Sequence, residues 1–457
     1  MPIPCSVAPS RRASAASIVA LLYSLLTAPV SAQPAGGDTA EPSVTGGAAE
    51  PAAESGAPAP VADVPPVQLA SEPAAEAEVP AYTLTGAQGS GVTLTVGDVF
   101  SLNVRSRIQL RYQLSIPNED AMGDRDLDQL VNIGTARLWF SGHIRVPELT
   151  YMIQLAVAGR DFRDGAISPI FDAYLDWKVH RDFSLRAGQF FVPFDRLRTV
   201  RESGLQMADR PRPVLELTLD RDVGVMLYSD HFLGDESPVA WRVGVFGGGG
   251  TNLSLGREPG ALLVARVELR PLGDIDDDTE GDLKRRAQPG LALGAAFAAN
   301  LNTNRSRSTT GTTFTGGTTD YVQAALDLVF KWRGFALQAE YIYRGASNDQ
   351  ILSTDDDGNP VVEYTRSGHG WILQGSYVFD PPFELVGRVS RLYALSGTAP
   401  AYISEVDTRG LEIAAGANYY FNDHKLKLQA DWIARMPPGA EFGRADHVVH
   451  LQLDITL

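Results

Sequence analysis

Arginines at alternating positions mark the segment of residues 100–116. Arg105, Arg107 and Arg111 all occupy odd positions, and the other odd positions of the segment are polar as well. A guanidinium group offers a planar fork of N–H donors that matches the oxygens of a carboxylate or a phosphate. A row of such groups could bind or guide anions, provided that the chain holds them on one face.

The even positions of the same segment, from Phe100 to Ile116, are apolar except for Ser106. This strict alternation predicts a β-strand, because successive side chains of a strand point to opposite faces. In a soluble sandwich the apolar face would meet a core. A run of this length, with arginines on its polar face, instead indicates a wall between lipid and water.

The same period-two pattern recurs about sixteen times from residue 98 onward. Tight links such as 332–334 and 380–382 alternate with long polar loops, as in bacterial outer-membrane barrels, whose periplasmic turns are short. We therefore predict an all-β fold, a transmembrane antiparallel β-barrel of about 16 strands within residues 81–457. Residues 271–289 break the alternation and are either a turn folded into the barrel or a miscounted strand.

Sorting the charged side chains by strand phase predicts a basic lumen. We count 17 inward-facing Lys and Arg against 10 Asp and Glu, although the whole chain carries a net charge of −16. Rings of Arg and Lys are the usual lining of anion and phosphate pores. Any single arginine could instead pair with an acid on a neighbouring strand, so the predicted anion preference rests on the sum. The candidate anion pathway consists of Arg105, Arg107, Arg111, Arg137, Arg145, Arg186, Arg242 and Arg266.

The first 80 residues are predicted to lie outside the barrel. Arg11 and Arg12 precede an apolar run that ends in a small-residue cleavage site at Ala32, which is typical of a secretory signal peptide over residues 1–32. An uncleaved membrane anchor is the alternative. Residues 33–80 are rich in Ala, Pro and Glu, so we predict a disordered periplasmic linker that acts as a spacer. A tether to the cell wall is the alternative for this linker.

A long loop follows the strand that ends near Phe191. Pro193 breaks the strand, and a new strand restarts at Arg221. Ordered loops of this length usually have a function. In a membrane barrel the natural place for such a loop is inside the lumen, where it would form a constriction.

Several motifs resemble the phosphate-selective porins of the "porin O and P" family. They are Arg137-Leu138-Trp139-Phe140-Ser141-Gly142, Gly188-Gln189-Phe190 with Pro193-Phe194, Asp209-Arg210, Arg221-Asp222-Val223-Gly224-Val225 and Gly416-Ala417-Asn418-Tyr419-Tyr420-Phe421. The resemblance spans about residues 95–457. It implies a sixteen-stranded barrel, commonly a homotrimer, with inward-folded loops and a ladder of arginines that guides anions.

The resemblance also implies which loop residues narrow the channel. The candidates for the constriction are Arg196, Arg198, Arg201, Arg210 and Arg221. The same loop carries as many acids as arginines, and lysines, which are prominent in phosphate-selective pores, are scarce here. Asp209-Arg210 and Asp220-Arg221-Asp222 are therefore interpreted as structural ion pairs, and anion preference is a safer expectation than phosphate selectivity.

Other function classes find little support in the sequence. Of the seven histidines, His143 and His450 face inward by strand phase, and neither lies near a serine nucleophile motif, so we do not expect an enzyme. We expect no cofactor, no metal site and no nucleic-acid binding. We predict a passive outer-membrane porin for small anions such as phosphate, surrounded by outer-membrane lipid and assembled as a homotrimer. A general non-selective porin and a structural anchor are the alternatives.

Overall fold

The computed structural model describes residues 82–118, 126–162, 169–252, 260–276, 278–355, 357–380 and 382–457. The predicted signal peptide and linker lie outside these residues. No helix among the described residues is long and apolar enough to cross a membrane.

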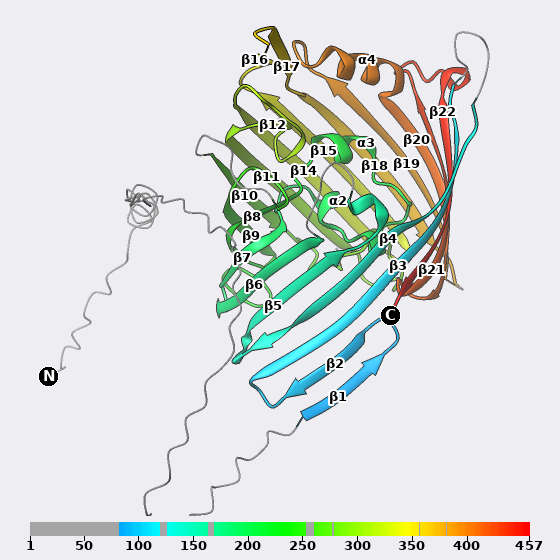
Figure 1. The fold of residues 1–457 in the computed structure, drawn as a ribbon. Coiled ribbons are helices and arrows are strands. Elements are labelled where there is room, and N and C mark those ends of the chain that lie inside the picture. Colours follow the sequence, from blue (N-terminus) through cyan, green and yellow to red (C-terminus); the bar gives the residue numbers. More distant parts are fainter. Residues whose placement is uncertain are drawn as a thin grey trace, which may run out of the picture. The chain divides into compact units, whose positions relative to one another are not determined.

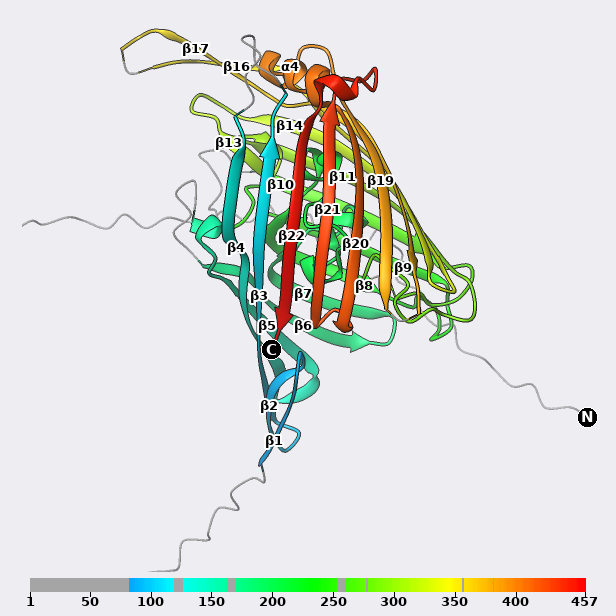
Figure 2. The same ribbon diagram turned by 90° about the vertical axis from the view of Figure 1, so that its right-hand side faces the viewer.

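Sixteen antiparallel strands form a closed barrel, as predicted (Figures 1 and 2). The last strand pairs with the first, from His447 opposite Ile116 to Thr456 opposite Arg107, so the barrel has no open edge along this seam. The strands are β3 (Phe100–Ile116), β4 (Asp128–Ile144), β5 (Val146–Ala156), β6 (Ile170–His180), β7 (Phe183–Phe191), β8 (Arg221–Ser229), β9 (Val239–Phe246), β10 (Ala261–Leu269), β11 (Gly290–Thr303), β14 (Thr319–Trp332), β15 (Phe335–Ala346), β18 (Gly368–Val378), β19 (Phe383–Ala394), β20 (Leu411–Asn422), β21 (Leu426–Met436) and β22 (Asp446–Thr456).

The alternation of side chains gives each strand an apolar outer face and a second face toward the lumen. In β10, for example, Leu263 and Val267 are exposed on the outside, whereas Arg266 and Glu268 are buried inside. Short turns join the strands at one end of the barrel and long loops join them at the other. By the usual rule for bacterial barrels, the end with short turns is periplasmic.

The strand β4 differs from the prediction at both ends. The period-two pattern predicted a strand near residues 132–147, whereas β4 spans Asp128–Ile144. Arg145 forms the turn to β5, with a positive φ of 65° and an exposed side chain. A register shift between Gln109 and Leu110 of β3 changes the phase of the pairing with β4. Arg145 therefore does not line the wall, whereas Trp139 of β4 is buried on the inner face.

A hairpin of β1 (Tyr82–Ala87) and β2 (Gly91–Val96) precedes the barrel and was not predicted. β2 pairs with the first residues of β3, along the edge that lies beyond the end of β22. At Gly91, with a φ of +73°, an added Cβ would lie 2.2 Å from the carbonyl oxygen of Val104, so only glycine fits this approach.

The long loop between β7 and β8 folds into the barrel (Figure 1). It contains α2 (Arg196–Thr199) and α3 (Arg212–Leu217). Leu197, Val214 and Leu217 pack against inward apolar residues of the wall, such as Ile372 and Leu392, and form the main apolar cluster of the protein. Apolar packing inside the lumen thus holds the loop on one side of the barrel.

Other long loops carry structure of their own. The outer loops contain β12 (Arg305–Arg307) with β13 (Thr310–Thr313), β16 (Gln350–Thr354) with β17 (Pro360–Tyr364), and α4 (Pro400–Arg409). Residues 270–289 connect β10 and β11 at the periplasmic end, and part of this connection folds into the lumen. The first of the two explanations for its length, a folded-in turn, is correct.

Candidate pore and its constriction

Four cavities follow one another inside the barrel, the first beside α3, α4 and β22 and the others mainly beside β3 to β9. Their volumes are about 620, 220, 340 and 390 Å³. Adjacent cavities share lining residues: Leu215 joins the first two, Glu202 and Arg210 the second and third, and Tyr174 and Arg186 the last two. Together they describe a route from the end with long loops to the periplasmic end.

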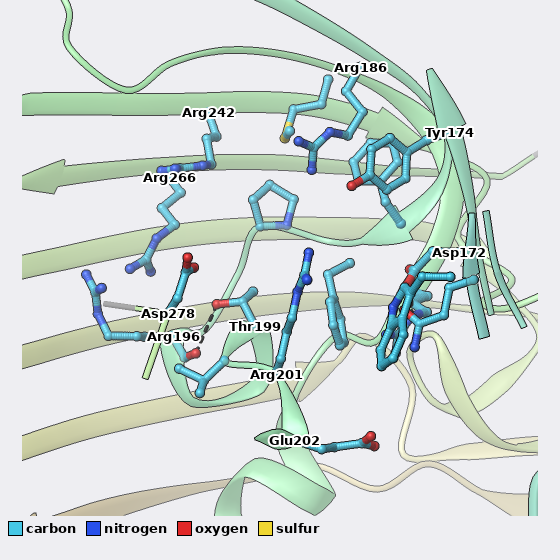
Figure 3. A pocket seen from close by; sticks show the side chains of 18 of the residues that line it. Asp172, Tyr174, Arg186, Arg196, Thr199, Arg201, Glu202, Arg242, Arg266 and Asp278 are labelled. Atoms are coloured by element: carbon cyan, nitrogen blue, oxygen red, sulfur yellow. Dashed lines mark hydrogen bonds and ion pairs between the residues drawn. The ribbon is translucent and has the colours of Figure 1, made fainter. Parts of the chain in front are cut away.

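Arginines outnumber carboxylates among the described residues that line the third cavity of this route (Figure 3). Among the described residues, eight arginines and four carboxylates line it. The outer cavity is instead balanced, with five arginines and five carboxylates in the described part of the chain. We call the third cavity the constriction, because the loop between β7 and β8 supplies one side of it. Its arginines are Arg107, Arg186, Arg196, Arg201, Arg210, Arg221, Arg242 and Arg266.

Three of the predicted pathway arginines are held by buried or half-buried acids. Arg107 donates two hydrogen bonds to Asp454, at 2.7 and 2.5 Å. Arg111 donates to Asp209 of the loop at 2.8 Å. Arg137 donates to Asp161 at 2.6 Å. These side chains brace the wall, so their charges are largely neutralised.

The predicted pathway residues on the following strands are paired as well. Arg186 contacts Asp176 at 2.5 Å, and its guanidinium lies 4.4 Å from the ring centre of Tyr174. Arg242 donates to Asp230 at 2.8 Å, near the periplasmic end. Arg186 and Arg242 keep part of their surface open, and both point toward the constriction in Figure 3.

A buried ionic network joins the loop to the wall beside the constriction. Arg196 of α2 contacts Glu268 at 2.5 Å and Asp327 at 2.8 Å. Arg266 donates to the other oxygen of Asp327 at 2.6 Å. Because both arginines serve the same two carboxylates, the network fixes α2 against β10 and β14.

The remaining arginines predicted for the constriction also make structural contacts. Arg198 pairs with Asp220, and Arg221 donates to Asp172 at 2.7 Å while it lies between the rings of Phe171 and Phe191, 3.6 Å from each centre.

Arg210 does not bind the adjacent Asp209. Its side chain donates to the carbonyl oxygens of Leu197 and Val200, at 3.0 and 2.6 Å. Burial lowers the pKa of the Arg210 guanidinium to about 10. This arginine therefore holds the backbone of the loop.

Arg105 and Arg201 differ from all of these. The guanidinium of Arg105 lies 5.0 Å from the ring centre of Trp139, and its Nε is buried without a hydrogen-bond partner. Arg201 is exposed in the loop, and no described carboxylate contacts either arginine. The positive charges of Arg201 and Arg105 repel each other. The two arginines therefore form a pair of like charges without an acid, beside the constriction.

The periplasmic connection meets the loop in the lower part of the lumen. Glu280 accepts hydrogen bonds from the backbone N–H of Gln206, at 2.7 Å, and from Gln374, at 2.9 Å. Lys427 donates to the carbonyl oxygens of Ser203 and Leu205, at 2.7 Å each. The sequence analysis did not single out Glu280 and Lys427 as residues that hold the loop. The length of residues 271–289 was the one signal that could have indicated them.

Glu216 of α3 is a second residue that the sequence did not single out. Its carboxylate contacts Arg344 at 2.8 Å, Arg366 at 2.9 Å and Arg307 at 3.3 Å. It thereby ties α3 to three different outer segments. This arrangement leaves the outer cavity without an excess of free cations.

Comparisons with known proteins agree with this architecture. A search of curated proteins found no match. Among solved structures, a Salmonella typhi OmpF complex with daunomycin has a TM-score of 0.52 at 14% identity, covering 79% of this chain and 99% of that one. An anion-selective porin from Comamonas acidovorans has a TM-score of 0.48 at 13% identity, covering 78% and 100%. At 14% identity the likeness to the OmpF structure concerns the fold alone.

The family comparison is more specific. The model of the family described as "Phosphate-selective porin O and P" matches residues 102–440. This match covers nearly all of the barrel and the loop that forms the constriction. The fold and the family together indicate the bacterial outer membrane. The chain therefore belongs to the phosphate-selective porin O and P family.

Proposed function

We propose that this porin is a passive channel that prefers small anions, phosphate among them. The observation that carries the proposal is the excess of arginines at the constriction, with Arg105 and Arg201 unpaired among the described residues. A solute anion would find two guanidinium groups there that no described acid occupies. Weak binding of this kind attracts an ion and still releases it.

The other arginines have a different role in this proposal. Arg107, Arg111, Arg137, Arg196 and Arg266 hold the wall and the loop in place through their acids. They shape the passage and add a weak positive potential. The proposed anion pathway thus involves fewer arginines than the sequence alone suggested. It centres on Arg105 and Arg201, with Arg186 and Arg242 nearer the periplasmic end.

A general porin of low selectivity is the second candidate function. It is favoured by the outer cavity, where arginines and acids are balanced in number. If this cavity limits the current, ions of both signs would pass with similar ease.

The two candidates are separated by phosphate titration of the chloride current through the purified porin in a planar bilayer. The anion proposal expects phosphate to reduce the chloride conductance in a saturable way. It also expects the double variant Arg105→Gln with Arg201→Gln to lose most of this block. A conductance that is insensitive to phosphate in the wild type would favour the general porin.

Three further features belong to the same proposal. We propose that the channel assembles as a homotrimer in outer-membrane lipid, that cleavage after Ala32 removes the signal peptide, and that residues 33–80 are a spacer. Deletion of residues 33–80 should then leave the conductance unchanged. Cross-linking in native membranes should give a ladder that ends at three copies.

A further inference from the structure

One arginine lies on the outer, lipid-facing surface of the barrel. In β19 the exposed Phe383 and Leu385 alternate with buried residues, and this alternation places Arg391 on the outside. Among the described residues of the sixteen barrel strands, Arg391 is the one Lys or Arg at an outward-facing position. It lies toward the end of β19 that carries the long loops, and therefore in the outer leaflet.

Aromatic rings surround this arginine on β15, β18 and β19, which are neighbours in the wall (Figure 1). The guanidinium lies 4.6 Å from the ring centre of Tyr393, which stacks on His369 at 4.6 Å. Trp371 lies opposite Arg391 in the strand register, and Tyr341 lies opposite Trp371. Such rings are typical of the membrane–water interface. We call these five residues the outer-leaflet patch.

No described residue of the protein supplies a counterpart for the charge of Arg391. Its Nε is buried and has no hydrogen-bond partner, and no described carboxylate forms an ion pair with it. An arginine on the lipid face costs about 2–4 kcal/mol at the bilayer midplane and about 0–1 kcal/mol near the interface. A negatively charged oxygen from the surrounding lipid would supply the missing partner at this depth.

We propose that the outer-leaflet patch binds the phosphate of a phosphorylated glycolipid, the lipid class that builds the outer leaflet of a bacterial outer membrane. The fork of Arg391 matches two phosphate oxygens. Tyr393 orients the guanidinium, while Trp371 and Tyr341 offer flat surfaces for the sugar and the first acyl methylenes. This inference depends on the location in the outer membrane and not on the anion preference of the lumen.

Native mass spectrometry of the detergent-purified porin tests the proposal, with bis-phosphorylated lipid A and its dephosphorylated form as the two probes. Arg391→Gln should weaken binding of the phosphorylated lipid about tenfold, because the charge-assisted bonds are lost. Arg391→Lys should weaken it less, since the charge remains without the fork. The control is Arg333→Gln, which removes an arginine that lies 5.1 Å from the ring centre of Trp332 at the periplasmic end. It should bind as the wild type does.

Three outcomes would overturn the proposal. Equal binding of phosphorylated lipid by Arg391→Gln and wild type would show that the arginine is not a ligand. Equal binding of both lipid forms by the wild type would mean that the rings alone hold lipid. Loss of the oligomer in Arg391→Gln would assign the arginine to a contact between copies of the chain. The reversal potential of Arg391→Gln should match that of the wild type, so failure of this inference is separable from failure of the channel proposal.

Discussion

The same strand alternation gives different inward-facing surfaces on the two sides of the lumen. On the side of β3 to β9, inward side chains are charged or aromatic and leave a chain of cavities. On the side of β10 to β19, inward apolar residues such as Ile342 and Ile372 pack against the loop between β7 and β8, and buried polar residues between them, such as Glu340, accept hydrogen bonds from it. Alternation alone therefore makes a wall. Whether the wall faces water depends on which inward residues the loop can cover.

A second difference lies within the open side. Most arginines there are matched by an acid at ion-pair distance, whereas Arg105 and Arg201 have none among the described residues. Replacing a matched arginine should destabilise the protein, because a buried acid would lose its charge partner. The unmatched pair can be changed with little structural cost, which makes structure and selectivity separable by mutation.

The largest expected effect is a loss of stability when an arginine that is paired with a buried acid is replaced. Arg107→Gln should lower the free energy of unfolding by about 3–5 kcal/mol, because Asp454 would remain buried without its cation. Urea unfolding in lipid vesicles, followed by tryptophan fluorescence, measures this loss. Arg201→Gln is the matched control and should change stability by less than about 0.5 kcal/mol. Similar stabilities for both variants would remove the distinction between the two classes.

The next largest effect is expected where apolar side chains of the loop fill one side of the lumen. Leu217→Ala should lower the free energy of unfolding by about 2–5 kcal/mol, because it leaves a cavity in the apolar cluster that holds α3. The loosened loop should also raise current noise in single-channel recordings. Leu352→Ala is the control, since Leu352 is 71% exposed in an outer hairpin. A quiet channel of wild-type stability in Leu217→Ala would contradict the role of this packing.

A smaller effect concerns selectivity. Replacing Arg105 and Arg201 together by Gln should lower the anion-to-cation permeability ratio roughly fivefold, since a unit charge at 4 Å contributes about 1 kcal/mol in water. The control replaces Arg333 and Arg444, which lie in a periplasmic turn and an outer loop. A ratio that falls equally in the control would mean that total charge, and not position, sets the selectivity.

The smallest expected effect is that of ionic strength on the anion preference. Raising the ionic strength from about 0.1 to 1 M shortens the Debye length from about 10 to 3 Å. The wild type should therefore lose part of its anion preference, while the double variant should change little. Reversal potentials at a fixed concentration ratio measure both. Equal salt dependence in the two proteins would argue against Arg105 and Arg201 as the source of the preference.

The sequence predicted the barrel well because alternation is a local property. Each strand shows its two faces without reference to its neighbours, and the wall of sixteen strands follows from the count. The bulge in β4, the turn at Arg145 and the β1–β2 hairpin were missed, because register and edge pairing depend on contacts between distant residues.

The site was predicted less completely. Strand phase correctly placed Arg107 and Arg266 on the inner face, but it could not show that Asp454 and Asp327 neutralise them. These acids are hundreds of residues away or on other strands. The inward folding of residues 270–289 likewise depends on Glu280 and Lys331 meeting partners that only the closed barrel brings near.

The reversal potential of the wild-type porin in a planar bilayer, under a tenfold KCl gradient, tests the central claim most directly. The excess of arginines at the constriction predicts a potential displaced toward the equilibrium potential of chloride. A displacement toward that of potassium would contradict the account, because it would mean that the acids of the outer cavity and the loops govern the passage of ions.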